Sequence, residues 1–364
     1  MKKLDWYIIK RFLVTFGVTM GMIMMIAVVF DLSEKAEQFL GNNASLADVF
    51  IGYYPNFILF YANTFSSLII FLSVILFTSI MAKNTEIIPM LTGGMSFNRF
   101  LRPYMISATI LVAFFLLMTH FIIPPSNRKR MEFEDKYDSQ HHRLNGFVFE
   151  GEPGKKVIID SYSSGDNIAK DLYISKRNFD KESDNFGYID YILFAQKAIN
   201  DTVTGKWTLQ HYSIRKFDGF GEHVVAQGPK LDTTFEFKIT QFTVPPERKA
   251  AMATPALIKQ IEKERKIGSK NIPMYLLSLH ERTSLPMATY VLTLIGVCIA
   301  SEKKRGGIGM SLMIGILIVA LYIFSQRMMA VSALQAGFNP LLAAWMPNII
   351  FGIVSIFYYF KAQK

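Results

Sequence analysis

The polar residues of this 364-residue chain do not form a recognisable catalytic or nucleotide-binding motif. His280 to Ser284 reads H-E-R-T-S and lacks the second histidine of a zinc-protease helix, and Gly94 to Asn98 reads G-M-S-F-N and lacks the last glycine of a serine-hydrolase elbow. There is no G-x-x-x-x-G-K-[ST] phosphate loop, and His141 has only His142 beside it at metal-ligand spacing. The sequence therefore disfavours an enzyme and predicts no metal and no cofactor on this chain.

The most informative polar residue is Glu86, in a short polar connection between two apolar runs. Residues 84–94 combine apolar side chains with this one acid and end on Gly93 and Gly94. The pattern predicts an amphipathic helix at about 84–94 that lies on the membrane surface and ends at the glycine pair. A carboxylate on such a helix can bind an arginine of a soluble partner, which would then exert force on the helix. A plain connecting loop without a partner remains the alternative.

Six apolar regions are each long enough to cross a membrane, and the helices that they form would hold these polar residues in place. About 20 apolar residues span the hydrocarbon layer as a helix, which satisfies its own peptide groups. The second and sixth runs exceed one span, and loops are expected to begin near Pro55 and at residues 337–340. The uncharged runs are Phe12–Phe30, Val49–Ala82, Pro103–Asn127, Thr283–Ser301, Gly306–Gln326 and Met328–Phe360.

Positive charge in the short loops predicts the orientation. Lysine and arginine near helix ends are retained in the cytoplasm, so the side that carries most of them is predicted to be cytoplasmic and to hold both termini. The other side's short loops carry only Lys35 and Arg327. The flanks on the predicted cytoplasmic side account for most of the net charge of +10, so this charge is poor evidence for nucleic-acid binding. The cytoplasmic set is Lys2, Lys3, Lys10, Arg11, Lys83, Arg99, Arg102, Lys303, Lys304, Arg305, Lys361 and Lys364.

A polar region between the third and fourth spans has a different composition and predicts an antiparallel sandwich or jelly roll outside the cytoplasm. Its short segments are rich in aromatic and β-branched residues and are separated by turn residues such as those at 201–205 and 218–221. Thr254 before Pro255 resembles a helix N-cap with proline at the first helical position, which predicts a short helix that continues over Ala256–Ile267. The predicted strands are Phe147–Phe149, Lys156–Tyr162, Leu172–Lys176, Tyr188–Ala198, Lys206–Phe217 and Thr233–Phe242.

Several ordered segments resemble the LptF/LptG family of lipopolysaccharide-export permeases over nearly the whole chain. Each segment is weak alone, and their order and spacing carry the resemblance; the N-terminal segment slightly favours the LptG half of the pair. The segments are Leu4–Phe12, Glu86–Gly94, Arg99–Pro103, Pro124 as the end of the third span, Lys206–Leu209, Leu285–Pro286, Lys304–Gly309, Asn339–Leu341 and Ala343–Asn348.

The resemblance implies a membrane α + β fold of six transmembrane helices with an inserted periplasmic antiparallel β-jelly-roll domain. Residues 1–125 would hold helices one to three with the coupling helix at about 84–94, residues 126–272 the periplasmic domain, and residues 273–364 helices four to six. Two such permeases would pair in the inner membrane with an LptB-type ATPase dimer, which carries the ATP and magnesium. The complex would extract lipopolysaccharide and pass it through LptC/LptA-type jelly-roll proteins toward the outer membrane.

Three sets of residues follow from this resemblance. The coupling helix would meet the ATPase through Glu86, Ile87, Met90 and Leu91. Lipid phosphates need cations at the outer rim of an apolar cavity, with snorkelling toward headgroups as the alternative role. Gly17 and Gly21 form a G-x-x-x-G in the first span that would pack closely on another helix, at a gate or within the chain. The candidate cations are Lys35, Arg128, Lys129, Arg130, Arg282 and Arg327, of which Lys35 and Arg327 are favoured.

Two other classes stay open at this stage. A force-transmitting membrane subunit of another lipid or lipoprotein transporter would also need an inner coupling helix, although usually with fewer spans. A membrane-anchored enzyme acting on envelope lipids would need a catalytic cluster in the outer domain, where acids and histidines occur without recognisable spacing. Only the export interpretation requires a second permease and a separate ATPase.

Overall fold

The computed structural model describes residues 3–41, 44–137, 143–152, 154–163, 167–177, 188–201, 204–218, 221–235, 246–266, 271–302 and 307–362. They belong to two compact units. The first comprises residues 1–130, 250–258 and 273–364 and is helical; the second comprises residues 131–249 and 259–272 and contains the sheet.

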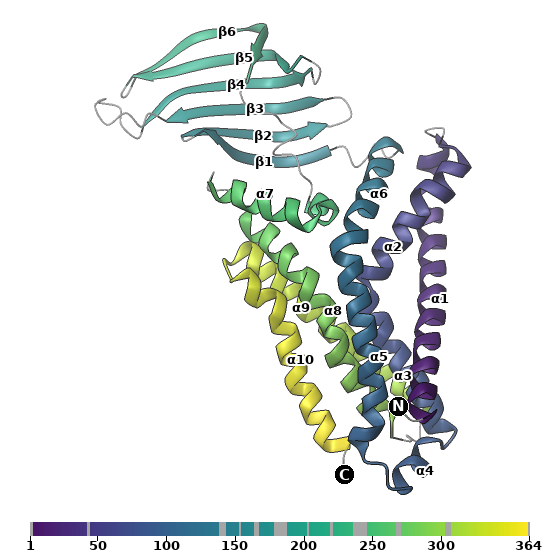
Figure 1. Ribbon diagram of the computed structural model, residues 1–364. Helices are drawn as coiled ribbons and strands as arrows, with labels where there is room; N and C mark the ends of the chain where they lie inside the picture. Colours follow the sequence, from purple (N-terminus) through teal and green to yellow (C-terminus); the bar gives the residue numbers. More distant parts are fainter. Residues whose placement is uncertain are drawn as a thin grey trace. The chain divides into compact units, whose positions relative to one another are not determined.

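The six predicted membrane spans are confirmed, because six helices in the described residues are long and apolar enough to cross a bilayer (Figure 1). They begin and end at Lys3–Glu37, Ser66–Lys83, Phe97–Glu134, Ile272–Ala300, Gly307–Gln335 and Pro340–Ala362. The helical elements are α1 (Lys3–Gly41), η1 (Asp48–Tyr53), α2 (Tyr54–Thr64), α3 (Ser66–Lys83), α4 (Ile87–Thr92), α5 (Phe97–Leu117), η2 (Met118–Ile122), α6 (Ile123–Tyr137), η4 (Pro246–Ala251), α7 (Thr254–Lys266), α8 (Ile272–Ala300), α9 (Gly307–Gln335) and α10 (Pro340–Ala362).

Two prolines expected at the ends of helices lie inside helical segments instead. Pro55 is in the first turn of α2, directly after the π-helical turn η1, and the break comes at Phe65 before α3. Pro124 is in the first turn of α6, which follows the π-helical turn η2, and the helix continues to Tyr137. Both expectations were wrong because a first-turn proline lacks only an N–H that needs no helical partner, and a π turn absorbs the change of register.

Helix α3 lies at the centre of the helical unit. One apolar cluster joins its Val74 and Phe77 to Phe12 of α1, to residues of α5 and to Val297 of α8. A second cluster joins its Phe71 and Ile75 to residues of α8, α9 and α10. Glycines allow this close packing: a Cβ on Gly315 of α9 would lie 2.2 Å from Ile75 Cδ1, and one on Gly296 of α8 would lie 2.9 Å from Val74 Cγ1.

Buried polar bonds hold α8 around its internal Pro286. Asn348 of α10 donates through Nδ2 to the carbonyl oxygen of Ser284 at 2.6 Å and accepts at Oδ1 from the Tyr322 hydroxyl at 2.7 Å. Ser67 of α3 donates to the carbonyl of Leu285 at 3.0 Å. Two backbone oxygens beside the proline thus accept from side chains of α10 and α3, which ties these helices to α8.

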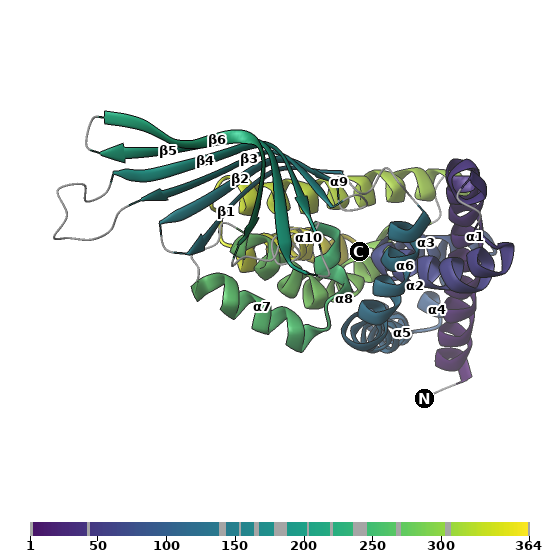
Figure 2. The same ribbon diagram turned by 90° about the horizontal axis from the view of Figure 1, so that it is seen from above.

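The second unit contains a six-stranded antiparallel sheet in sequential order β1-β2-β3-β4-β5-β6 (Figures 1 and 2). It confirms the antiparallel sheet inserted between the third and fourth spans. Trp207, 1% exposed, packs in its core with alternating residues such as Val157 and Ile159. The strands are β1 (Arg143–Glu152), β2 (Lys155–Ser163), β3 (Ile168–Arg177), β4 (Ile189–Asn200), β5 (Lys206–Asp218) and β6 (Gly221–Thr234).

Strand β6 is longer and earlier than the last predicted strand. The prediction began at Thr233, but the pairing with β5 already runs from Gly221 to Thr234, and residues 236–242 of the predicted strand lie outside the described residues. Gly228 and Pro229 concealed the strand in the sequence. An edge strand tolerates a proline because the missing N–H need not belong to a ladder, and a Cβ on Gly228 would press on the Tyr212 ring at 3.3 Å.

The short helix of this region begins one residue earlier than predicted. The amide of Leu257 donates to the carbonyl of Ala253 at 2.9 Å, so α7 begins at Thr254 and Ala253 is its N-cap. Thr254 was expected to cap the helix, but its hydroxyl bonds to Arg282 and His120 instead. Ile267, the predicted last residue, lies outside the described residues.

Candidate functional site

Helix α4 is the short helix that the sequence predicted around Glu86. A tight turn leads into it, in which the Glu86 amide donates to the carbonyl of Met81 at 2.9 Å and Thr85 has a φ of +55°. At its end the amides of Gly94 and Met95 donate to the carbonyls of Leu91 and Met90, and Gly94 has a φ of +88°. This is a Schellman ending, which confirms that the helix stops at the glycine pair.

The faces of α4 are sharply different. Ile87 is 1% exposed and packs in the apolar cluster that includes α1 and α3, and Met90 is half-buried against the same cluster. Ile88 is 51% exposed and Leu91 36% exposed. Of the residues predicted for partner contact, Ile87 and Met90 thus anchor the helix to its own chain, and the outward apolar surface belongs to Ile88 and Leu91.

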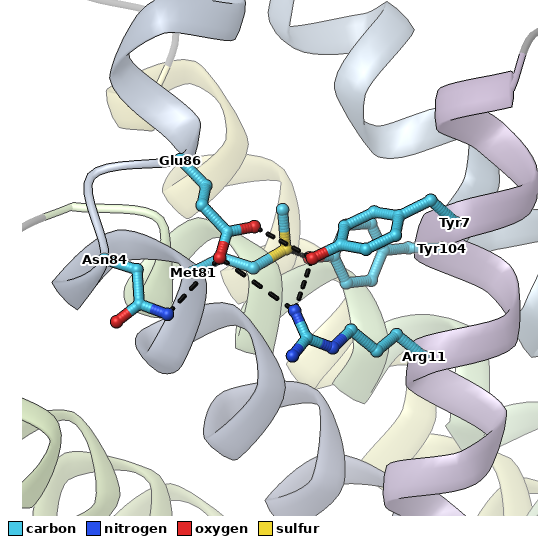
Figure 3. A network of polar contacts seen from close by, with 6 residues as sticks. All are labelled: Tyr7, Arg11, Met81, Asn84, Glu86 and Tyr104. Atoms are coloured by element: carbon cyan, nitrogen blue, oxygen red, sulfur yellow. Dashed lines mark hydrogen bonds and ion pairs between the residues drawn. The ribbon is translucent and has the colours of Figure 1, made fainter.

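A polar network fixes Glu86 from two sides (Figure 3). The Tyr7 hydroxyl donates to Oε2 at 3.0 Å, and Asn84 Nδ2 donates to Oε1 at 3.3 Å. Arg11 donates to the Tyr7 hydroxyl, and its guanidinium nitrogen lies 3.9 Å from Glu86 Oε1. Because 27% of the Glu86 side chain and 50% of the Arg11 side chain remain exposed, water and a partner protein can both reach this network.

A second ion pair holds the start of α1 to the start of α5. Arg99 donates to Asp5 Oδ2 at 2.7 Å, and Asp5 is only 5% exposed. Ser96 caps α5 by accepting from the Arg99 amide at 3.3 Å. The first turns of α1 are therefore bonded both to α5 and to the turn before α4. The sequence analysis did not single out Tyr7 or pair Arg11 with Glu86. The only signal in the sequence was that Tyr7 and Arg11 are four residues apart, on one helix face, and at the same predicted end of the spans as Glu86.

Three of the six predicted lipid-binding cations are held within their own chain. Lys35 forms an ion pair with Asp31 at 3.3 Å and donates to the hydroxyl of the buried Tyr53 at 2.7 Å. Arg130 donates to Asn127 at 3.0 Å, and its guanidinium lies 4.7 Å from the centre of the Phe60 ring.

Arg282 is the third of these enclosed cations. It is 5% exposed and donates to Thr254 Oγ1 at 2.7 Å and to the carbonyl of Met252 at 2.6 Å. Its bonds thus fasten the segment before α7 to α8. The other three predicted cations, Arg128, Lys129 and Arg327, are exposed.

The two glycines predicted to pack closely on another helix do not do so within the described chain. A Cβ on Gly17 or Gly21 would meet no atom within 4 Å. They lie on an exposed apolar face of α1 that includes Val14, Val18 and Met22. A similar exposed face on α9 carries Leu317, Leu321, Phe324 and, beside them, Arg327.

Metal ligands are not gathered in the part of the chain that the structure describes, where no three His, Cys, Asp or Glu side chains lie close enough to share an ion. His141 and His142, which the sequence did not favour as metal ligands, lie outside the described residues.

Six apolar helices with an inserted antiparallel sheet define a multi-pass membrane protein. The sequence pattern of the family described as "Lipopolysaccharide export system permease LptF/LptG" matches residues 6–361, and the chain belongs to this family. Its members are transport permeases rather than enzymes. No curated protein matches the chain.

Proposed function

We propose that this chain is one of two permease subunits of an ABC transporter that extracts lipopolysaccharide from the periplasmic leaflet of the inner membrane. The family match over residues 6–361 is the observation that carries the proposal. The excess of lysine and arginine on one side supports cytoplasmic termini and a periplasmic sheet domain. The chain itself would bind no cofactor; ATP and magnesium would be bound by a separate LptB-type ATPase dimer.

Helix α4 is the proposed docking site for that ATPase. The helix is anchored inward by Ile87 and presents Ile88 and Leu91 outward, next to the partly exposed carboxylate of Glu86. Apolar side chains beside an acid suit a partner groove that offers an arginine at its edge. A helix held by its own core on one side can transmit force, because a push on its outer face is not lost in local bending.

The lipid would bind near the ends of the membrane helices that lie opposite to α4. Arg327 is the best candidate for a phosphate contact, because it is exposed on α9 directly beside an apolar face that suits acyl chains. Arg128 and Lys129 are further exposed candidates. Lys35, Arg130 and Arg282 would support lipid binding indirectly, by holding the helices in place through their own bonds, or directly, by exchanging one of those bonds for a bond to a lipid phosphate.

The exposed apolar faces of α1 and α9 are the proposed contacts with the second permease. Gly17 and Gly21 leave α1 open to a close helix contact that the described part of its own chain does not provide. LptC/LptA-type jelly-roll proteins would receive the lipid from the sheet domain.

The proposal is tested by purifying the tagged protein from its native envelope in mild detergent and identifying co-purifying proteins and lipid by mass spectrometry. A small ATPase, a second six-span permease and a lipopolysaccharide-type lipid are expected. A homo-oligomer without an ATPase would overturn the proposal. Ile88→Glu should lose the ATPase while keeping the second permease, which locates the docking site on α4.

A further inference from the structure

The carboxylate of Glu86 is bonded to α1 of its own chain before any partner arrives. We infer that Tyr7 and Arg11 are positioning residues that join α4 to α1, so that force on α4 moves the first membrane helix. The inference rests on the proposed function for the source of that force. It assigns a coupling role to two residues that would otherwise be interpreted only as the polar start of a membrane helix.

The bonds in this network form one connected path (Figure 3). Arg11 donates to the Tyr7 hydroxyl, and that hydroxyl donates to Glu86 Oε2 at 3.0 Å. Tyr7 and Arg11 are one turn apart on the same face of α1, so a single rigid surface contacts the carboxylate. Hydrogen bonds with a charged acceptor are stronger than neutral ones, which makes this carboxylate a firm point of attachment.

Apolar packing reinforces the same connection. Ile87, the first residue of α4, is buried in one cluster with Ile8 and Phe12, which lie between and beside the network residues on α1. The backbone link from α3 to α4 is only the turn at residues 84–86, with Thr85 in the left-handed region. A β-branched residue rarely takes that conformation, so the turn is held in place by the contacts around it.

Helix α1 is suited to carry a displacement. It is continuous over 39 residues, and at about 1.5 Å per residue a helix of that length reaches from one membrane face to the other. Beyond its first turns it presents an exposed apolar face, with Val18, Met22 and Met25 all more than half exposed. Motion imposed near Tyr7 and Arg11 would therefore reach the part of α1 that faces the lipid or the second permease.

The network also explains how Glu86 could serve two contacts at once. Its carboxylate has acceptor positions on two oxygens, and Arg11 lies 3.9 Å from Oε1, farther than a direct hydrogen bond. Oε1 accepts from Asn84 at 3.3 Å and has a second acceptor position, so a partner arginine can bind it without breaking the bond from Tyr7 to Oε2. Partner binding and attachment to α1 can then coexist on one side chain.

The test compares Tyr7→Phe and Arg11→Gln with matched controls in the complete complex in proteoliposomes. Tyr290→Phe removes another hydroxyl that joins two helices, its 3.1 Å bond to Thr109, and Arg102→Gln removes another exposed arginine of the same side. The measured quantity is ATP hydrolysed per lipid exported. Loss of one charge-assisted bond at a partly exposed site should raise it about three- to tenfold.

Three results would support the inference together. Both network variants keep the ATPase bound and raise the ratio, Arg11→Lys stays near the wild-type value, and both controls leave the ratio unchanged. Network variants that match their controls would overturn it while leaving the proposed function intact. If the wild-type chain binds no ATPase, the proposed function fails, and the following measurement still tests the connection.

Spin labels report the connection directly. Labels at Ile88→Cys on α4 and Val18→Cys on α1, in a Cys298→Ala background, give the distance between the two helices by pulsed electron paramagnetic resonance. Cys298 is the only native cysteine and is buried, so labelling is confined to the two sites. A narrow distribution that broadens on Tyr7→Phe supports the inference. A distribution that Tyr7→Phe leaves unchanged contradicts it.

Discussion

Replacing Gly315 of α9 by alanine should destabilise the helical unit, because the new methyl group would enter occupied space. A Cβ there lies 2.2 Å from Ile75 Cδ1 and 3.6 Å from the Phe71 ring, whereas carbon atoms in contact prefer about 3.5–4.0 Å. Ile75 and Phe71 are both fully buried, so neither side chain can swing into open space. Relief of the clash requires either the end of the Ile75 side chain to displace its packed neighbours or α9 to move away from α3.

The expected size follows from two opposing terms. Overpacking a core costs about 1–3 kcal/mol, and so short a distance indicates the upper end of that range. Alanine is favoured over glycine in a helix by about 1 kcal/mol. The net loss in the free energy of unfolding should be about 2 kcal/mol, or a fall in Tm of roughly 4–8 °C for a unit of this size.

Thermal unfolding of the purified protein in mild detergent measures the effect. Gly352→Ala on α10 is the matched control, because its Cβ would meet no atom within 4 Å, and it should leave Tm unchanged or raise it. Ile75→Val removes the clashing Cδ1, so the double variant with Gly315→Ala should recover about 1 kcal/mol relative to additivity. A Gly315→Ala protein as stable as the control, or no recovery in the double variant, would refute the reasoning.

Three further variants test other parts of the molecule. Asn348→Leu should cost about 1–3 kcal/mol in unfolding free energy, since the Tyr322 hydroxyl and a backbone carbonyl lose their buried partner; an unchanged Tm would contradict this. Ile87→Ala should lower stability by about 2–5 kcal/mol, whereas Ile88→Ala should leave Tm unchanged and weaken only ATPase co-purification; equal Tm values for the two would argue against the assigned faces of α4. Arg327→Glu should abolish lipid export at a normal protein level while Arg327→Lys keeps most of it, and undiminished export by the glutamate variant would remove Arg327 from the lipid site.

Local properties of the chain allowed much of the fold to be predicted. The six spans follow from hydropathy, since a membrane helix needs only a sufficient run of apolar residues. The end of α4 follows from Gly93 and Gly94, because a Schellman ending needs a left-handed residue and a Cβ on Gly93 would lie 2.9 Å from the carbonyl of Pro89. The family, too, was recognisable from the order of short segments along the chain.

Features that depend on neighbours were not predictable in the same way. Pro55 and Pro124 suggested helix ends, but π turns before them let the helices continue. Pro229 concealed β6, since only the sheet order reveals that this strand lies at an edge where a proline is tolerated. Ile87 and Ile88 are chemically identical, and only packing decides which one is buried.

The sequence by itself therefore determined that this protein spans a membrane six times, carries an inserted antiparallel sheet and has a short apolar helix, preceded by Glu86, between its second and third spans. Hydropathy, strand composition and glycine placement are local properties that can be read from neighbouring residues in the sequence. Only the tertiary structure decided which cations are already bonded and that Tyr7 and Arg11 meet Glu86. The Tyr7 and Glu86 that bond here are 79 positions apart, so the contact exists only once helix packing has brought the two segments together.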